Sequence, residues 1–201
     1  MTKVQLAAGI FVVRFKTQYE LASTFLRIQE HYESTRFKDR VFTLEEYMDW
    51  YAGRFGAFTY FEDWSGFNVP STALRPFYDG TFDPLREKER RLLAMFRKVR
   101  DPFYVIGISN EQDLHHEVAH ALYFMRPEYR KAVDTAMRKY NTKALAGRLA
   151  AMGYHRSVLA DEVHAYLVST KDLRGIKATR HAPLRKELMA IYRRFAPPLT
   201  R

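Results

Sequence analysis

The segment His116-Glu-Val-Ala-His120 has the form H-E-x-x-H, in which two histidines are separated by about one helical turn. Residues four apart on a helix lie on the same face, so both imidazoles can reach one metal ion. Glu117 then lies beside that ion, where a carboxylate can act as a general base. The spacing therefore predicts a metal-dependent hydrolytic site, provided that this segment is helical.

The residues around the motif have the pattern of an amphipathic helix. At about 100° per residue the apolar side chains cluster on one side, and the two histidines lie nearly opposite. The apolar residues are Leu114, Val118, Ala121, Leu122 and Met125. Asn110 is a candidate N-cap, and Asp113 would lie in the first turn. We therefore expect a helix over residues 110–126 whose apolar side packs in the core while the histidines face a cleft.

A catalytic zinc ion takes three protein ligands and keeps one position for water, so a third ligand is needed. Glu128 lies two turns beyond His120 and past Pro127, too far along to reach the same ion, and Glu187 lies at the solvated edge of a helix face. Glu162 points into the apolar side of its predicted helix, where an unpaired carboxylate would cost several kcal/mol unless it met a cation. His164 points about 200° away from Glu162 and is not expected to share the ion.

An H-E-x-x-H helix with 41 residues between its second histidine and a helix-borne glutamate resembles the gluzincin branch of the zincin metallopeptidases. The resemblance covers mainly residues 103–169. It implies one zinc ion per chain, held by His116, His120 and Glu162, and it makes Glu117 the base that polarises the attacking water. The zinc would lower the pKa of that water and polarise the scissile carbonyl group.

One position departs from the gluzincin pattern. Many relatives place an aspartate four residues after the ligand glutamate, where it orients the first histidine, but this chain has Tyr166 there. We therefore expect Asp113 or Asp161 to support the ligands instead. A further group should stabilise the oxyanion, and we expect Tyr166 in this catalytic role, with His155 and Tyr123 as alternatives.

Hydrophobic periodicity and turn signals predict the elements that must position this site. Strands are expected over residues 4–15, 58–61 and 103–108. Helices are expected over residues 18–34, after a capping box at Thr43–Glu46, and over 84–97, 110–126, 128–140, 142–152, 156–169 and 183–195. This order predicts a helix-dominant α+β, zincin-like fold in a single domain, residues 1–201. Residues 1–109 would form a mixed part with a small sheet, and residues 110–201 an all-helical part that carries the metal site.

In zincins the substrate lies along an edge strand above the active-site helix. Residues 103–108 are too uniformly apolar for an edge, so the strand at residues 58–61 is the expected substrate strand. Tyr60, Trp64 and Phe67 would line the substrate wall, although an aromatic cluster of this kind is also typical of a core.

The composition narrows the classes of protein further. The chain has no cysteine, which excludes disulfides, thiol nucleophiles and cysteine-ligated zinc. The apolar run Leu6–Val13 is too short to span a bilayer and is typical of a strand rather than a signal peptide, so a cytoplasmic protein without a membrane partner is expected.

Residues 126–201 contain 17 Lys and Arg against 6 Asp and Glu. Such a basic half is typical of a solvated surface but can also attract nucleic acid.

These observations predict a zinc metallopeptidase that cleaves a peptide or protein substrate, with Glu117 as general base. One alternative is a zinc hydrolase of a small non-peptide amide or ester, because the motif determines the reaction type and not the substrate. Another is a basic nucleic-acid-associated binding protein in which the H-E-x-x-H segment is not catalytic.

Overall fold

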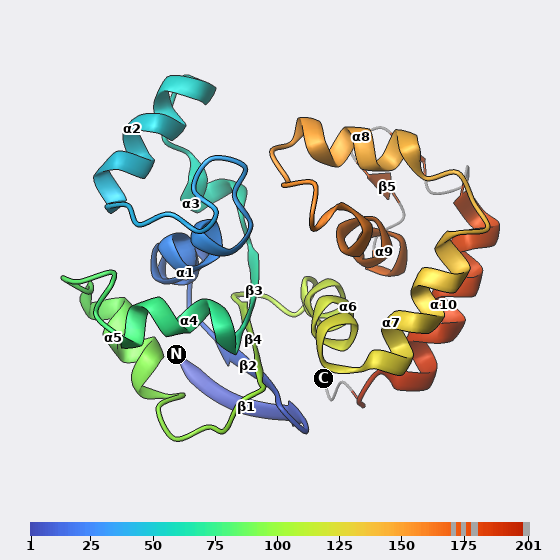
Figure 1. Ribbon diagram of the computed structural model, residues 1–201, viewed down its shortest axis with the longest axis horizontal. Coiled ribbons are helices and arrows are strands. Elements are labelled where there is room, and N and C mark those ends of the chain that lie inside the picture. Colours follow the sequence, from blue (N-terminus) through green and yellow to red (C-terminus); the bar gives the residue numbers. More distant parts are fainter. Residues whose placement is uncertain (170–171, 174–175, 178–180, 199–201) are drawn as a thin grey trace. The chain divides into compact units, whose positions relative to one another are not determined.

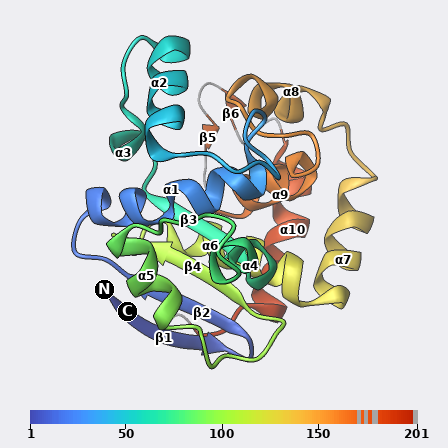
Figure 2. The same cartoon turned by 60° about the vertical axis from the view of Figure 1, so that its left-hand side comes forward.

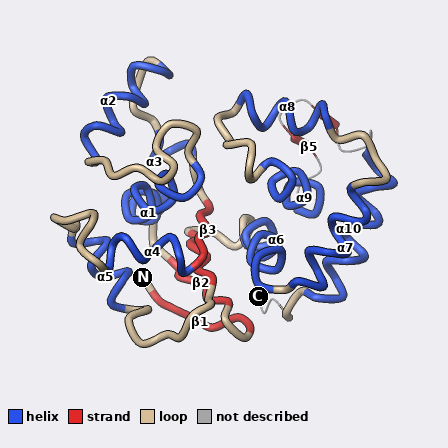
Figure 3. Tube along the Cα trace, in the orientation of Figure 1, coloured by secondary structure: helices blue, strands red, loops and turns tan. Residues whose placement is uncertain are grey.

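The computed structural model describes residues 1–169, 172–173, 176–177 and 181–198. The chain divides into two compact units, which we call the N-terminal unit (Met1–Glu111) and the C-terminal unit (Gln112–Arg201). Helices dominate, and a small mixed sheet of four strands is present, so the predicted helix-dominant α+β class is confirmed at this level. Figure 3 shows the strands of this sheet in red among the helices.

The sheet lies in the N-terminal unit and has the order β1-β2-β4-β3. The neighbours β1 and β2 are antiparallel, β2 and β4 parallel, and β4 and β3 antiparallel. The strands are β1 (Thr2–Ala7), β2 (Ile10–Arg14), β3 (Gly66–Pro70) and β4 (Tyr104–Ile108). Every residue of β4 is buried, as expected for a strand of apolar sequence that lies between two other strands of the sheet.

Two strand predictions were wrong. Residues 4–15 form parts of two strands, because Gly9 adopts φ 74° and turns the chain back into a hairpin. Residues 58–61 contain no strand. The Thr59 carbonyl accepts hydrogen bonds from the amides of Glu62 and Asp63, which closes the short helix α3 (Tyr60–Asp63). The edge strand beside β4 is β3 instead.

The helices α1, α4 and α5 of the N-terminal unit lie on one side of its sheet (Figures 1 and 2). The larger helices of this unit are α1 (Gln18–Glu33), α2 (Leu44–Phe55), α4 (Ser71–Tyr78) and α5 (Glu87–Ala94). The capping box predicted at the start of α2 is confirmed, since Thr43 and Glu46 exchange side-chain to backbone hydrogen bonds. Helix α4 was not expected, because it contains Pro76.

An aromatic core fills the space between these helices and the sheet. Tyr60 and Phe67 are each 1% exposed, and Phe25 stacks on Phe67 with ring centroids 5.5 Å apart. Trp64 packs partly buried against the same core. The predicted substrate wall is therefore wrong for Tyr60 and Phe67, and the alternative, an aromatic core, is confirmed for them.

The C-terminal unit consists mainly of helices, and α9 contacts α6, α8 and α10 within it. Its elements are α6 (Leu114–Met125), α7 (Pro127–Met137), α8 (Lys143–Ala151), α9 (Leu159–Ser169), β5 (Asp172–Leu173), β6 (Ile176–Lys177) and α10 (Ala182–Phe195). The prediction of Asn110 as the N-cap was wrong, because α6 begins at Leu114 and its N-cap is Asp113. None of the helices in the described part of the chain has the length and apolar character that crossing a bilayer requires.

Candidate metal centre

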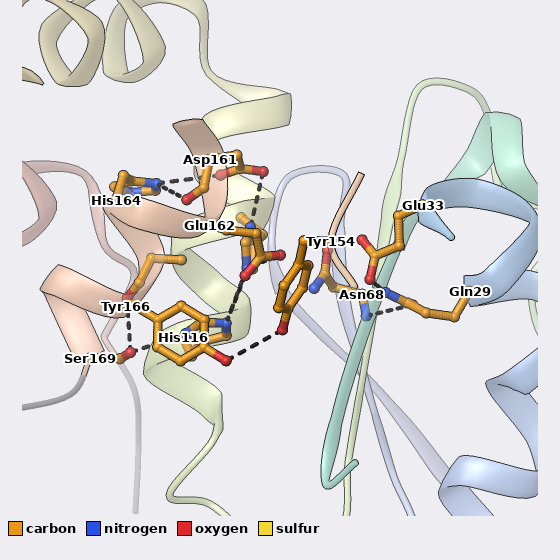
Figure 4. A network of polar contacts seen from close by, with 12 residues as sticks. Gln29, Glu33, Asn68, His116, Tyr154, Asp161, Glu162, His164, Tyr166 and Ser169 are labelled. Carbon is orange, nitrogen blue, oxygen red and sulfur yellow. Dashed lines mark hydrogen bonds and ion pairs between the residues drawn. The ribbon is translucent and has the colours of Figure 1, made fainter. Parts of the chain in front are cut away.

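Two neighbouring helices of the C-terminal unit bring His116, His120 and Glu162 together. The histidines lie on α6 one turn apart, and the glutamate comes from α9, which packs against α6. His116 Nε2 lies 3.2 Å from His120 Nε2. Glu162 Oε1 lies 3.5 Å from His120 Nε2, and Glu162 Oε2 lies 3.8 Å from His116 Nε2. These three side chains form a group that could hold a metal ion. Figure 4 shows the contact between His116 and Glu162 in this group.

The three separations can be compared with the geometry of a zinc site. Zinc–nitrogen and zinc–oxygen bonds of about 2.0–2.1 Å in a tetrahedral arrangement place neighbouring ligand atoms about 3.3–3.4 Å apart. The 3.2 Å between the two imidazole nitrogens and the 3.5 Å from Glu162 Oε1 to His120 Nε2 lie close to this range, and the 3.8 Å joins His116 Nε2 to the other oxygen, Oε2. One ligand atom from each of the three residues lies within 4.8 Å of the other two, so these side chains could hold one metal ion.

Hydrogen bonds identify the nitrogen of His116 that faces the site. Its Nδ1 lies 3.1 Å from the hydroxyl of Ser169, and this hydroxyl donates to the carbonyl of Ala165 at 2.8 Å. The only hydroxyl proton is thus used, so Ser169 accepts and His116 Nδ1 donates. In the neutral ring Nε2 then carries a lone pair, as a metal ligand requires.

The second histidine is oriented in the same way by a carboxylate. His120 Nδ1 lies 2.9 Å from Asp161 Oδ2. Burial alone would raise the pKa of Asp161, but the charge and hydrogen bond of His120, with a further hydrogen bond from His164, outweigh it and hold this pKa at about 2. An ionised Asp161 can only accept, so His120 Nδ1 donates and His120 Nε2 points at the site.

Two imidazole nitrogens and a carboxylate oxygen thus converge with their lone pairs facing one another, and this arrangement needs a positive charge. Burial lowers the pKa of His116 well below its usual value, and the nearby charge of His120 adds to this. Burial would also lower the pKa of His120, but Asp161 and Glu162 outweigh it and raise this pKa well above the usual value. Without a metal, one proton on His120 supplies the charge, and a divalent cation can take its place.

The two predicted catalytic residues lie at this centre. Glu117 is buried on α6 at 4% exposure, and its charge contributes to the raised pKa of His120. Tyr166 on α9 packs its ring edge-on to that of His116 with centroids 4.7 Å apart, and its hydroxyl lies 3.3 Å from that of Tyr154 (Figure 4). Nothing in the sequence indicated that Tyr154 lies near this centre, because Tyr154 precedes α9 and belongs to no segment with a helical or strand periodicity.

The other candidates have partners elsewhere. The Tyr123 hydroxyl donates to Asp134 at 2.7 Å, and His155 lies before α9 with its Nδ1 2.8 Å from the Ser157 hydroxyl. Neither is brought into the group of three.

Of the two aspartates expected to support the ligands, Asp161 contacts a ligand histidine and Asp113 is the N-cap of α6, whereas the contacts of Ser169 and His164 are clear only in the structure. Asp161 contacts the second histidine and not the first, and Ser169 occupies the place beside the first. His164 is outside the ligand group, as its helical phase predicted, but its Nδ1 lies 3.3 Å from Asp161 Oδ1. Ser169 lies seven residues after Glu162, and this spacing of two helical turns was the one signal that could have indicated it.

Comparisons of the chain with models of protein families, with curated proteins and with solved structures found no match.

Proposed function

We propose that this chain is a zinc-dependent metallopeptidase that binds one zinc ion through His116, His120 and Glu162. The proposal is supported by one observation above all. Two imidazole Nε2 atoms lie 3.2 Å apart beside a carboxylate, while both Nδ1 atoms are engaged as donors. This is the arrangement expected of ligands prepared for a cation rather than of histidines that only fill a core.

Zinc bound there would supply a Lewis acid and a water molecule of lowered pKa. Glu117 is buried on α6 directly after His116. It would take a proton from the attacking water and deliver it to the leaving amine. The paired hydroxyls of Tyr166 and Tyr154 would donate to the developing oxyanion. We propose a peptide bond as the substrate because the ligand pattern resembles that of the gluzincins. We also propose that the protein acts in the cytoplasm.

The metal is tested by its stoichiometry in the full-length protein. After purification in metal-free buffer and addition of zinc, the wild type should retain about one zinc ion per chain, and Glu162→Ala should retain much less because a three-ligand site becomes a two-ligand site. His115→Ala is the matched control, since His115 is exposed on the same helix. A wild type that binds no zinc, or a Glu162→Ala variant that binds it as well as the control, would contradict the proposal.

The substrate is tested separately with the zinc-loaded protein. A library of unmodified peptides analysed by mass spectrometry should show new termini with the wild type and none with Glu117→Gln. Hydrolysis of small amides or esters without peptide cleavage would instead favour the alternative hydrolase. Salt-sensitive binding of nucleic acid by a protein that holds no zinc would favour the binding protein.

A further inference from the structure

Two fully buried side chains near the metal centre belong neither to its ligands nor to its base. They are Tyr129 on α7 and His164 on α9, each at 0% exposure. The Tyr129 hydroxyl lies 2.7 Å from His164 Nε2. His164 Nδ1 lies 3.3 Å from Asp161 Oδ1, and the other oxygen of Asp161 lies 2.9 Å from His120 Nδ1. Four side chains from three helices thus form one chain of contacts that ends on a predicted metal ligand.

The direction of each hydrogen bond in this chain follows from its acceptors. His164 Nδ1 faces the backbone oxygen of Asp161 at 3.1 Å as well as its carboxylate, and both groups only accept. His164 therefore carries its proton on Nδ1, and its Nε2 accepts from the Tyr129 hydroxyl. Asp161 receives one hydrogen bond on each carboxylate oxygen, from His164 and from His120.

Packing holds the His164 ring in this orientation. The Tyr123 ring stacks on it with centroids 5.4 Å apart and an interplanar angle of 26°, and the Tyr129 ring meets it nearly edge-on. The guanidinium group of Arg130 covers the Tyr123 ring at 5.0 Å. A ring that is packed on its face and hydrogen-bonded at both nitrogens cannot turn without breaking these contacts.

We propose that Tyr129 and His164 are positioning residues of the metal site, which act through Asp161. The inference rests on the proposed zinc-binding function. His164 fixes one oxygen of Asp161, so the other oxygen stays directed at His120 Nδ1 and keeps His120 Nε2 directed at the ion. Outer partners of ligating histidines typically contribute about 10–100-fold to metal affinity. This gives His164 a role that its direction away from Glu162 did not suggest.

The test measures zinc dissociation constants of the full-length protein by competition with a chromogenic chelator. Tyr129→Phe removes one hydroxyl and should weaken zinc binding several-fold, and His164→Phe should weaken it by about 10–100-fold. Tyr192→Phe is the matched control, because Tyr192 is also buried in this unit but its hydroxyl lies beside the exposed His115. Cobalt(II) absorption spectra report the ligand geometry, which a loss of general stability would not change.

Each outcome has a separate meaning. If the wild type binds zinc and both variants bind it as tightly as Tyr192→Phe, the positioning role is overturned while the proposed function stands. If the wild type binds no zinc, both are overturned. Should a variant fail to fold, imidazole nitrogen NMR of the wild type decides. His164 is expected in the Nδ1–H form, and an Nε2–H form would overturn the inference.

Discussion

The Nε2 atoms of His116 and His120 face each other at 3.2 Å, with the carboxylate of Glu162 beside both. A proton on His120 can supply the positive charge that balances this group, and under the proposed function a zinc ion would take its place. The consequences for zinc binding can be measured without knowing the substrate.

Zinc should stabilise the folded chain. Because the ion binds the assembled ligands and not the dispersed ones, excess zinc should raise the melting temperature and a chelator should lower it. Circular dichroism of the helices measures this directly. The same zinc titration of Glu162→Ala should give a much smaller shift, and equal shifts in both proteins would exclude Glu162 as a ligand.

Glu117→Gln should separate proton transfer from metal binding. The amide keeps the shape of the side chain but cannot accept a proton, so turnover should fall on the order of 10²-fold or more while zinc stoichiometry is kept. Peptide cleavage and bound zinc should be measured on the same samples. A fully active variant would exclude Glu117 as the base. A variant that binds no zinc would show that Glu117 is needed for metal binding.

The N-terminal unit should lose stability if its buried ion pair is broken. Arg27 Nε and Nη2 lie 2.8 and 2.5 Å from the two carboxylate oxygens of Glu89, and Arg27 is 6% exposed. Removing Arg27 leaves the buried Glu89 carboxylate without its counter-charge, so Arg27→Met should cost about 3–5 kcal/mol. Urea unfolding followed by tryptophan fluorescence is selective, because Trp50 and Trp64 both lie in this unit.

The double variant Arg27→Met/Glu89→Leu is the control for that experiment. With both charges removed, a large part of the lost stability should return. A double variant as unstable as the single one would show that packing, and not the unpaired charge, causes the loss.

Two glycine-to-alanine changes should have opposite effects. A Cβ at Gly107 in β4 would lie 2.5 Å from Phe25 Cε2 and 2.8 Å from Leu21 Cδ1, so Gly107→Ala should destabilise the unit by about 1–3 kcal/mol. At Gly53 in α2 nothing lies within 4 Å of an added Cβ. Gly53→Ala should therefore stabilise the unit by up to about 1 kcal/mol through helix propensity. Equal effects in urea unfolding would contradict the close packing at Gly107.

The stability of the N-terminal unit should fall as the pH rises from about 4.5 to about 7. Burial raises the pKa of Glu30 from 4.5 to about 7, although hydrogen bonds, first from Tyr60 at 2.8 Å, lower it. The folded chain thus holds a proton that the unfolded chain releases, and this stabilisation, complete below pH 4.5, is lost as the pH passes through 7. Tryptophan-detected unfolding at pH 5 and pH 8 measures the difference.

Glu30→Gln cannot ionise and should reduce this dependence on pH. Glu45→Gln, at an exposed position on α2, should leave it unchanged. A Glu30→Gln variant with the same pH dependence as the wild type would show that another group is responsible.

The sequence by itself determined the elements that depend on nearby residues. The capping box at Thr43 and Glu46, the helix at 18–33 and the apolar strand β4 all follow from interactions within a few positions. The same is true of the shared helix face of His116 and His120, because i,i+4 geometry is a property of any α-helix. The phase of Glu162 relative to its apolar neighbours predicted its direction, and the structure brings it to the histidines.

Only the tertiary structure decided which side chains complete these elements. Residues 58–61 are too few to show a hydrophobic periodicity that distinguishes a helix from a strand. Their conformation was determined by packing in the aromatic core and by a hydrogen bond from Tyr60 to Glu30. The contacts of Asp161 with His120 and of Tyr129 with His164 join residues 41 and 35 positions apart. Such contacts depend on how α6, α7 and α9 pack together, and helical periodicity describes each helix alone.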